Sequence, residues 1–554
     1  MSRFSNFQRH CLSVAISQAL LVPMVVQSAT VEVDTVLDDN NPVGCSLREA
    51  VQTINTGLST NNDCNAIGAF GANDQINFNL PSNSTITLSG SEIVVSSSVS
   101  INGPGASELT IDGNNQSRIF NINNAANSVV DGLTLTGGYT TLTGGALSVA
   151  GSQSFVLSNS VISSNVATGG SGGIHISSSS DSTINNSTIS NNFANFADAG
   201  GIQVVSSNGM VILDSTITNN AGFDDGGGIT FLNSNGASVI NSTITGNSSY
   251  YGGAIDVGFS NGFQVIGSTI KDNSSYYCGG LDVVSSNGFE INDSTVIDNL
   301  SLYQGGGICL SSSNGSRVIG SSIVGNEAGT NGGGLDVNNV NDFSMASSTV
   351  ANNSSSVGGG IAFRNDTSGE IINSTISGNT AEESGSGGQG GGIFSSANNI
   401  EGVSLFANTL VGNRALSLTT NSGGGIYDQS ASSIILEVNN VVANSEGGDC
   451  NGTLLFGTNN WIDDSSCTGI ALGDPSLGIL RNNGGITLTH KPLLGSGLVG
   501  AGSADRCNDA PINGVDQIGL PRGSISCTIG AVEDVESHLF VIPLPNGKIL
   551  IFEL

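Results

Sequence analysis

"GGAIDVGFSNGFQVIGSTIKDN" (Gly252–Asn273) is followed after five residues by "GGLDVVSSNGFEINDSTVIDN" (Gly279–Asn299), which is nearly a copy of it. The apolar residue after the glycines recurs at intervals of 26 to 28 residues, and of 32 and 33 residues in the last two units. These positions are Leu147, Ile174, Ile202, Ile229, Ile255, Leu281, Ile308, Leu335, Ile361, Ile393 and Ile426. Such near-constant spacing predicts a solenoid of one repeated unit.

Each unit contains three short segments in which apolar and polar residues alternate. "GGAIDV", "GFQVI" and "GSTI" have this period of two, and "SNG" before the second segment supplies turn residues. Three strands per unit can coil so that each pairs in parallel with its copy one rung on, at a spacing of about 4.8 Å. The sequence therefore predicts an all-β, right-handed parallel β-helix with three strands per rung.

A second periodic column consists of the asparagine that closes each unit. Its members are Asn165, Asn192, Asn220, Asn247, Asn273, Asn299, Asn326, Asn353, Asn379 and Asn413. An amide at the same corner of every rung can donate to the next one, which satisfies buried polar groups by repetition. We expect an internal asparagine ladder, with the glycines at corners where the backbone needs positive φ or close approach.

The charge of the chain excludes some classes of partner. Lys and Arg total 13 against 44 Asp and Glu, which gives a formal charge of -31. Such a chain repels phosphate backbones and anionic lipid surfaces, so we expect no nucleic-acid binding. Hydrophobic residues make up 37% of the chain and are regularly spaced, which predicts a folded protein.

The N-terminus is typical of an export signal. Arg3 and Arg9 precede the apolar stretch "CLSVAISQALLVPMVV", and small residues near Ser28 and Ala29 offer a cleavage site. The alternative is a membrane anchor, but the run is interrupted by polar residues and is shorter than the about 20 residues of a comfortable span. We predict a signal peptide over residues 1–29, no transmembrane helix in the mature chain, and a secreted or cell-surface location.

Removal of the signal peptide with Cys11 leaves eight of the nine cysteines, an even number that suggests disulfides in an exported chain. Proximity in sequence suggests the pairs Cys45 with Cys64, Cys450 with Cys467, and Cys507 with Cys527. Cys278 and Cys309 are offset by four residues in register, about 13 Å along a strand, whereas a disulfide needs Cα atoms within about 7 Å. We predict that these two are free thiols.

The ends of the solenoid are expected to carry caps. "CSLREAVQTIN" (Cys45–Asn55) predicts a short helix with a capping box at Ser46 and Glu49 and one apolar face, formed by Leu47, Ala50, Val51 and Ile54. We assign residues 30–76 to an N-terminal cap, 77–445 to the β-helix and 446–536 to a disulfide-tied C-terminal cap. Residues 537–554 read either as a hairpin about Asn546 and Gly547 or as a sorting tail.

These motifs resemble known exported bacterial proteins. "CSLREA" is similar to the CSLREA domain, and "DPSLGILRNNGGITLTHKPLLGSGLVGAG" with "DQIGLPRGSISCTIGAVE" is similar to the choice-of-anchor Q module. The repeats resemble those of polymorphic outer-membrane proteins, with Ile, Val or Leu in place of Phe. Ile518 stands where relatives usually have Arg, and "GSGLVGAG" lacks their usual Asp. The resemblance implies a pectate-lyase-like β-helix displayed outside the cell, without implying a reaction.

One patch of tyrosines and aspartates departs from the regular repeat pattern. Just before the glycines of three consecutive rungs lie Tyr250, Tyr251, Tyr276, Tyr277 and Tyr303. One residue after the anchors, and therefore predicted to face outward, lie Asp256, Asp282, Cys309 and Asp336. Stacking predicts separations of about 4.8 Å between Asp256 and Asp282 and about twice that between Asp282 and Asp336.

The patch has several interpretations. The tyrosines can stack for stability alone, or they can form a non-catalytic surface for a glycan or cell-surface ligand. Carboxylates at about 5 Å suit a retaining glycosidase and at about 6.5 to 9.5 Å an inverting one, which makes the three aspartates catalytic candidates. Asp256 and Asp282 are also candidate Ca²⁺ ligands, and no other cofactor is expected. Since His175 lies three rungs from Asp256, we favour adhesion or carbohydrate binding, with a polysaccharide lyase or hydrolase as the alternative.

Overall fold

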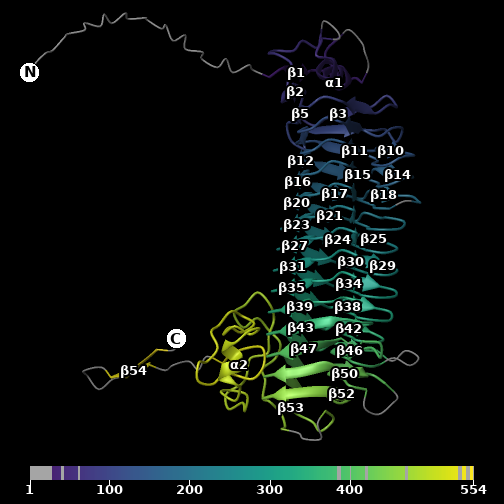
Figure 1. Ribbon diagram of the computed structural model, residues 1–554. Coiled ribbons are helices and arrows are strands. Elements are labelled where there is room, and N and C mark those ends of the chain that lie inside the picture. The colour runs from purple at the N-terminus through teal and green to yellow at the C-terminus, as the bar shows by residue number, and fades with distance from the viewer. Residues whose placement is uncertain are drawn as a thin grey trace, which may run out of the picture.

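The computed structural model describes residues 28–38, 43–59, 63–196, 198–382, 388–399, 401–417, 422–467, 472–534, 540–543 and 549–552. The chain winds into one long parallel β-helix, as Figure 1 shows. Each strand pairs in parallel with its copy in the next rung, so the predicted fold class is confirmed. Most rungs add a fourth strand of only two residues, which the sequence pattern does not reveal.

Four columns of strands form the walls. Column 1 starts at the repeat anchors and contains β4 (Ile93–Val95), β7 (Phe120–Asn123), β11 (Leu147–Ala150), β15 (Ile174–Ser177), β19 (Ile202–Val205), β22 (Ile229–Leu232), β26 (Ile255–Gly258), β30 (Leu281–Val284), β34 (Ile308–Ser311), β38 (Leu335–Asn338), β42 (Ile361–Arg364) and β46 (Ile393–Ser395). Column 2 contains β1 (Thr30–Val33), β2 (Asp74–Phe78), β5 (Val99–Asn102), β8 (Val129–Asp131), β12 (Val156–Ser158), β16 (Thr183–Asn185), β20 (Val211–Leu213), β23 (Ser238–Ile240), β27 (Gln264–Ile266), β31 (Glu290–Asn292), β35 (Arg317–Ile319), β39 (Phe343–Ala346), β43 (Ser368–Ile372) and β47 (Gly402–Phe406). The long strands β50 (Ile426–Val438) and β52 (Cys450–Thr458) join these two columns.

Column 3 contains β3 (Ser84–Thr87), β6 (Leu109–Asp112), β9 (Thr134–Thr136), β13 (Val161–Ser163), β17 (Thr188–Ser190), β21 (Thr216–Thr218), β24 (Thr243–Thr245), β28 (Thr269–Lys271), β32 (Thr295–Ile297), β36 (Ser322–Val324), β40 (Thr349–Ala351), β44 (Thr375–Ser377), β48 (Thr409–Val411), β51 (Val441–Ala443) and β53 (Trp461–Ile462). Column 4 contains β10 (Tyr139–Thr140), β14 (Val166–Ala167), β18 (Phe193–Ala194), β25 (Ser248–Ser249), β29 (Ser274–Ser275), β33 (Leu300–Ser301), β37 (Glu327–Ala328), β41 (Ser354–Ser355), β45 (Thr380–Ala381) and β49 (Arg414–Ala415). Column 4 forms the edge that carries the tyrosines.

The core is a set of apolar stacks inside the coil. The anchors, among them Ile255 and Leu281, are fully buried, because every second residue of a strand points inward. Phe263 and Phe289, which follow the "SNG" turns, stack one above the other with ring centroids 6.0 Å apart. Burying each such side chain contributes about 1.5 to 3 kcal/mol, so the repeat gains similar stabilisation at every rung.

The asparagine column forms the predicted internal ladder. The Nδ2 of Asn247 donates to the Oδ1 of Asn273 at 3.0 Å, and the Nδ2 of Asn273 donates to the Oδ1 of Asn299 at 3.0 Å. The same Nδ2 groups also donate to carbonyl oxygens, such as that of Ile244. All ten members of the column are buried, so the prediction is confirmed.

Two serine columns add ladders that we did not predict. In one of them the backbone N–H of Ser268 donates to the Oγ of Ser294 at 3.1 Å, and the hydroxyl of Ser294 donates to the carbonyl of Asn292 at 2.7 Å. The other column runs through Ser260 and Ser286 in the same manner. Each hydroxyl accepts from one rung and donates within its own, which satisfies a buried corner without a charged group.

The helix α1 (Leu47–Thr56) lies at the N-terminal end of the solenoid, shown at the top of Figure 1. Ser46 and Glu49 form the predicted capping box, and the predicted apolar face is buried. The signal peptide predicted over residues 1–29 stays a prediction, since residues 1–27 lie outside the described residues. Within the described part of the chain, no helix has the length and apolar character needed to cross a membrane.

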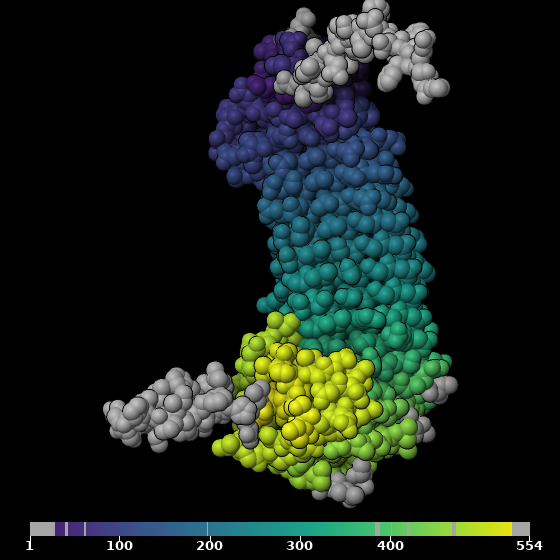
Figure 2. Space-filling model, turned by 60° about the vertical axis from the view of Figure 1, so that its left-hand side comes forward, coloured from purple at the N-terminus to yellow at the C-terminus, as the bar shows by residue number. Residues whose placement is uncertain are grey.

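Residues 472–534 pack against the side of the last rungs rather than across their end, as Figures 1 and 2 show in yellow. They include the short helix α2 (Ala504–Asn508). Gln517 accepts from the hydroxyl of Thr375 at 2.6 Å, and Arg522 donates to the Oδ1 of Asn373 at 2.7 Å. The strands β54 (Phe540–Pro543) and β55 (Ile549–Phe552) form an antiparallel hairpin, although its expected turn at residues 546–547 lies outside the described residues.

Candidate functional site

Strand pairing aligns the aspartates of the patch in one column. Asp256 pairs with Asp282, Asp282 with Cys309, and Cys309 with Asp336, on consecutive strands β26, β30, β34 and β38. We call Asp256, Asp282 and Asp336 the carboxylate column. The predicted register is therefore present, with one rung between the first two carboxylates and two between the last two.

The carboxylate column is more buried than expected. Asp282 is 7% exposed and Asp336 2% exposed, whereas Asp256 is half-buried. The side chains leave the solenoid core, but the corner glycines pack closely against these residues. A Cβ atom at Gly252 would lie 2.9 Å from the backbone nitrogen of Asp256, and one at Gly332 2.7 Å from that of Asp336. A corner glycine also contacts the strand in the neighbouring rung. There the backbone N–H of Gly226 donates to the hydroxyl of Thr230, which pairs with Asp256, at 2.9 Å. The outward position predicted from the alternation is thus covered by the corner segment.

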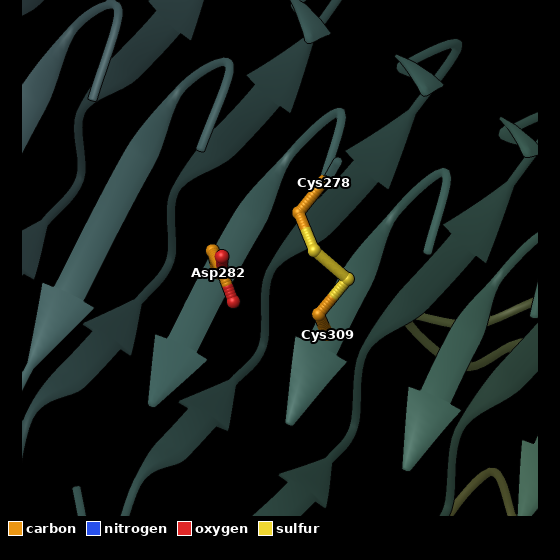
Figure 3. Close-up of side chains that lie close together, drawn as sticks. All are labelled: Cys278, Asp282 and Cys309. Carbon is orange, nitrogen blue, oxygen red and sulfur yellow. A yellow bond between two sulfur atoms is a disulfide. The ribbon is translucent and has the colours of Figure 1, made fainter. Parts of the chain in front are cut away.

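Cys278 and Cys309 form a disulfide, so the prediction of two free thiols is wrong. Their Cα atoms lie 6.1 Å apart, and Figure 3 shows Asp282 beside the bridge. The predicted offset assumed a straight strand, but the chain turns at Gly279 and Gly280, which brings the residue before the corner back over the strand. The other three predicted pairs, Cys45–Cys64, Cys450–Cys467 and Cys507–Cys527, are confirmed.

Gly305 leaves the space that this disulfide occupies. A Cβ atom at Gly305 would lie 2.1 Å from the Sγ of Cys309, whereas one at Gly315 would have no neighbour within 4 Å. Both glycines have positive φ, so they share the backbone strain of a substitution. We expect Gly305→Ala to cost about 1 to 3 kcal/mol more than Gly315→Ala, because it overpacks the bridge.

Denaturation midpoints of the two alanine variants, with mass spectrometry of the unreduced protein, check this expectation. The wild-type digest should contain a Cys278–Cys309 cross-linked peptide, and the Gly305→Ala digest should contain less of it. Equal midpoints for the two variants and equal amounts of the cross-linked peptide would contradict the geometry.

Burial raises the pKa values of the carboxylate column. Burial, with the charges of Asp336 and Asp225, raises the pKa of Asp282 to about 7. Burial and then the charge of Asp282 raise the pKa of Asp256 well above its usual value. A carboxyl group with a pKa of about 7, such as that of Asp282, can donate or accept a proton near neutral pH, which is the property of a general acid or base.

Residues outside the predicted column affect the pKa values of its carboxyl groups. Burial and the charges of Asp198 and Asp224 raise the pKa of Asp225 to about 6. At the other end, Arg364 donates to both oxygens of Asp336 at 2.7 and 2.5 Å. Burial still raises the pKa of Asp336 despite this ion pair. The spacing of 28 residues from Asp336 to Arg364, close to one repeat, is the sequence feature that could have revealed the pair.

The five tyrosines form a double stack, which we call the tyrosine ladder (Tyr250, Tyr251, Tyr276, Tyr277 and Tyr303). Tyr250 stacks on Tyr276 with centroids 4.9 Å apart, and Tyr251 stacks on Tyr277 at 5.1 Å. Tyr276 continues to Tyr303 at 6.3 Å. Four of the rings are 37 to 42% exposed and Tyr277 is less so. The rings therefore cover one another's faces along the ladder and present their edges to solvent.

Among the residues that the structure describes, two groups bring possible metal-binding atoms together, and neither is the predicted pair. Cys278, Asp282 and Cys309 have ligand atoms within 4.8 Å, but the sulfurs are joined in a disulfide. Asp449, Asp463 and Asp464 also converge, and burial with the other two carboxyl groups raises the pKa of Asp449 to about 8. The Ca²⁺ prediction for Asp256 and Asp282 stays a prediction.

Comparison with known proteins agrees with the fold. A family model described as a right-handed β-helix region matches residues 172–337. Curated proteins contain no matching sequence. Together with the observed coil, the match defines the class of this protein as a right-handed parallel β-helix.

Several solved structures are similar to the chain at low identity. The periplasmic alginate epimerase AlgG is 11% identical, with 59% of this chain and 83% of that chain covered and a TM-score of 0.33. The pectate lyase Pel9A is 13% identical, with 91% and 97% covered and a TM-score of 0.27. PfbA, a surface adhesin of Streptococcus pneumoniae, is 12% identical, with 72% and 87% covered and a TM-score of 0.34. These low-identity similarities assign no activity to this protein.

Proposed function

We propose that this protein is an exported β-helical display protein that binds a carbohydrate along the tyrosine ladder without cleaving it. The observation that carries the proposal is the contrast between exposed tyrosines and buried acids. Phenol edges and hydroxyl groups recur at every rung of the ladder, whereas Asp282 and Asp336 are almost fully covered. A surface can hold a glycan by such contacts, but a covered carboxyl group cannot reach its glycosidic bond.

The spacing of the ladder supports this ligand class. A pyranose unit advances an extended chain by about one rung, so sugars running along the solenoid would meet equivalent groups at each step. Tyrosine combines an apolar ring with a hydroxyl that can donate or accept, which suits the mixed surface of a sugar. The four disulfides among the described residues support export, because such bonds persist in oxidising compartments.

The alternative function is a lyase or hydrolase at the carboxylate column. It is favoured by the half-buried Asp256 and by the pKa of Asp282 near 7. Assays of new reducing ends and of unsaturated products, on the glycans that the protein binds, separate the two functions. Turnover that Asp282→Asn abolishes would establish the enzyme and contradict a purely binding role.

The double variant Tyr250→Ala/Tyr276→Ala tests the binding surface. We expect it to weaken glycan binding roughly 30-fold, because two ring contacts of order 1 kcal/mol each are lost. A glycan array with the wild-type mature protein identifies the ligand, and isothermal titration calorimetry gives the affinities.

Phe259→Ala is the matched control for this double variant. Phe259 is an aromatic residue, 59% exposed, at the opposite end of β26 from Tyr251. Its removal should leave glycan affinity unchanged. If the tyrosine variant melts far below wild type and the array shows no glycan for the wild-type protein, the ladder only stabilises the solenoid and the proposal is wrong.

A further inference from the structure

A cavity of about 390 Å³ lies at the N-terminal end of the edge that carries the tyrosine ladder. Three segments from successive turns line it: the residues before β4, the residues before β7, and strand β10 with the residue after it. The lining residues are Gly90, Ser91, Glu92, Gln116, Ser117, Arg118, Tyr139, Thr140 and Thr141. Its volume is at the lower end of the range of about 300 to 1,000 Å³ typical of small-molecule sites.

Charged side chains form a fixed floor in this cavity. Arg118, which is buried, donates from Nη1 to Glu92 at 2.5 Å and from Nε and Nη2 to the carbonyl of Thr143 at 3.1 and 2.7 Å. The second oxygen of Glu92 accepts from Asn121 at 2.8 Å. The two charges of the pair compensate each other, so the site is locally neutral. The pair still offers guanidinium N–H groups and carboxylate lone pairs to a ligand.

The wall of the cavity is held by the helix α1. Arg48 donates to the carbonyl of Ser91 at 2.7 Å and to that of Glu92 at 2.9 Å. The same guanidinium binds both carboxylate oxygens of Asp38 at 2.8 Å. Although burial opposes it, the hydrogen bonds from Arg48 and Ser89 lower the pKa of Asp38. A bidentate pair of this kind fixes orientation, so the wall that carries Glu92 is preorganised.

One polar atom of the lining lacks a partner. The hydroxyl of Ser117 is buried and has no hydrogen bond in the described structure, whereas buried polar groups are normally paired. The backbone N–H of Tyr139 donates to the carbonyl oxygen of Ser117 at 3.1 Å, and Tyr139, 37% exposed, is the only aromatic side chain of the lining. One ring, several hydroxyl and amide groups and an unpaired buried hydroxyl suit a polyhydroxylated ligand such as a sugar, and do not suit an apolar one.

The cavity is connected to the tyrosine ladder by exposed aromatic residues on the same edge. Strand pairing leads from Tyr139 through Val166, Phe193 and Ala221 to Ser248, one rung at a time. These four steps span about 19 Å at a rung spacing of about 4.8 Å. Along this path lie the exposed rings of Phe193, Phe196 and Phe223.

We infer that the cavity bounded by Tyr139, Ser117, Arg118 and Glu92 binds the terminal sugar of a neutral glycan whose next units run along the exposed aromatic residues to the tyrosine ladder. This inference rests on the proposed function and adds recognition of a chain end to it. A neutral glycan is favoured because the ion pair of the cavity is compensated and the formal charge of -31 repels polyanions.

The test compares short and long chains on three proteins: wild type, Tyr139→Ala and Leu142→Ala. The probes are hexasaccharides of cellulose, mannan, xylan and chitin, together with soluble polymers of the same sugars, measured by isothermal titration calorimetry. Leu142 is 64% exposed three residues from Tyr139 and does not line the cavity, which makes it the matched control. We expect Tyr139→Ala to weaken binding of the hexasaccharide at least fivefold. The polymer should change less than twofold, because its many internal segments still bind the ladder.

Ser117→Ala distinguishes a ligand-binding role of this hydroxyl from a structural one. Removing an unpaired buried hydroxyl should leave the melting temperature unchanged or raised, while the hexasaccharide binds more weakly. Unchanged hexasaccharide affinity in both Tyr139→Ala and Ser117→Ala, with the wild type still binding glycans, would overturn the chain-end site alone. Absence of binding by the wild type to every probe and to the glycan array would overturn the proposed function and this inference together.

Discussion

Replacing Asn273 with leucine is expected to lower the free energy of unfolding by roughly 4 kcal/mol or more, because it interrupts the internal ladder at four hydrogen bonds. The Oδ1 of Asn273 accepts from both the backbone N–H and the Nδ2 of Asn247, at 2.9 and 3.0 Å. Its Nδ2 donates to Asn299 and to the carbonyl of Ile244, each at 3.0 Å. Leucine is similar in size but cannot replace any of these bonds, and water cannot enter the buried corner. Each buried group left without a partner costs about 1 to 3 kcal/mol.

Asn261→Leu is the matched control, since it makes the same substitution in an adjacent, exposed turn. The Oδ1 of Asn261 accepts from the backbone N–H of Asn287 at 2.8 Å, but water can satisfy that donor when the amide is removed. Urea denaturation followed by circular dichroism compares the midpoints of the two variants. A loss in Asn261→Leu as large as that in Asn273→Leu would show that the ladder is not the source of the stability.

The fold could be predicted in detail because the repeat encodes it many times. The column from Ile255 to Leu281 and Ile308 predicted strand register directly, and the asparagine column predicted which polar side chains are internal. The serine ladders were missed because serine is common in both buried corners and exposed turns, so its periodicity alone does not indicate burial. Column 4 was missed because strands of two residues have no measurable alternation.

The candidate site was less predictable because it depends on how the corner segments fold. The sequence placed Asp282 outside the core, but the burial of its carboxyl group comes from the segment that contains Cys278. The distance from Cys278 to Cys309 could not be obtained from strand spacing once the chain turned at Gly279. The cavity near Arg118 was not predicted at all, because it combines loops from irregular opening coils that share no repeat. Periodicity predicts what every rung shares, whereas these features belong to single rungs.

Raising the pH from 5 to 8 is expected to destabilise the protein, because the folded state holds a proton on Asp282 that the unfolded state releases. The pKa of Asp282 is about 7 in the folded protein and 3.8 without the fold, mainly owing to burial and then to the charge of Asp336. Between these values the folded state binds more protons, so stability decreases as pH rises and levels off above about 7. The difference between these two pKa values corresponds to at most about 4 kcal/mol of stability. The raised pKa of Asp256 acts in the same direction.

Asp282→Asn should remove most of this pH dependence and stabilise the protein at pH 8, since the amide keeps the shape without a buried charge. Asp293→Asn removes one charge from an exposed position near the next corner and should leave the slope unchanged.

Melting temperatures of the three proteins from pH 5 to 8 in EDTA measure the effect, and the same series in CaCl₂ tests the Ca²⁺ prediction. An ion held between Asp256 and Asp282 would compensate the charges, so Ca²⁺ would raise the melting temperature of wild type at pH 8 and flatten its profile. A wild-type profile in EDTA that is flat, or that rises towards pH 8, would show that Asp282 is ionised at little cost. The carboxylate column would then be solvated rather than covered.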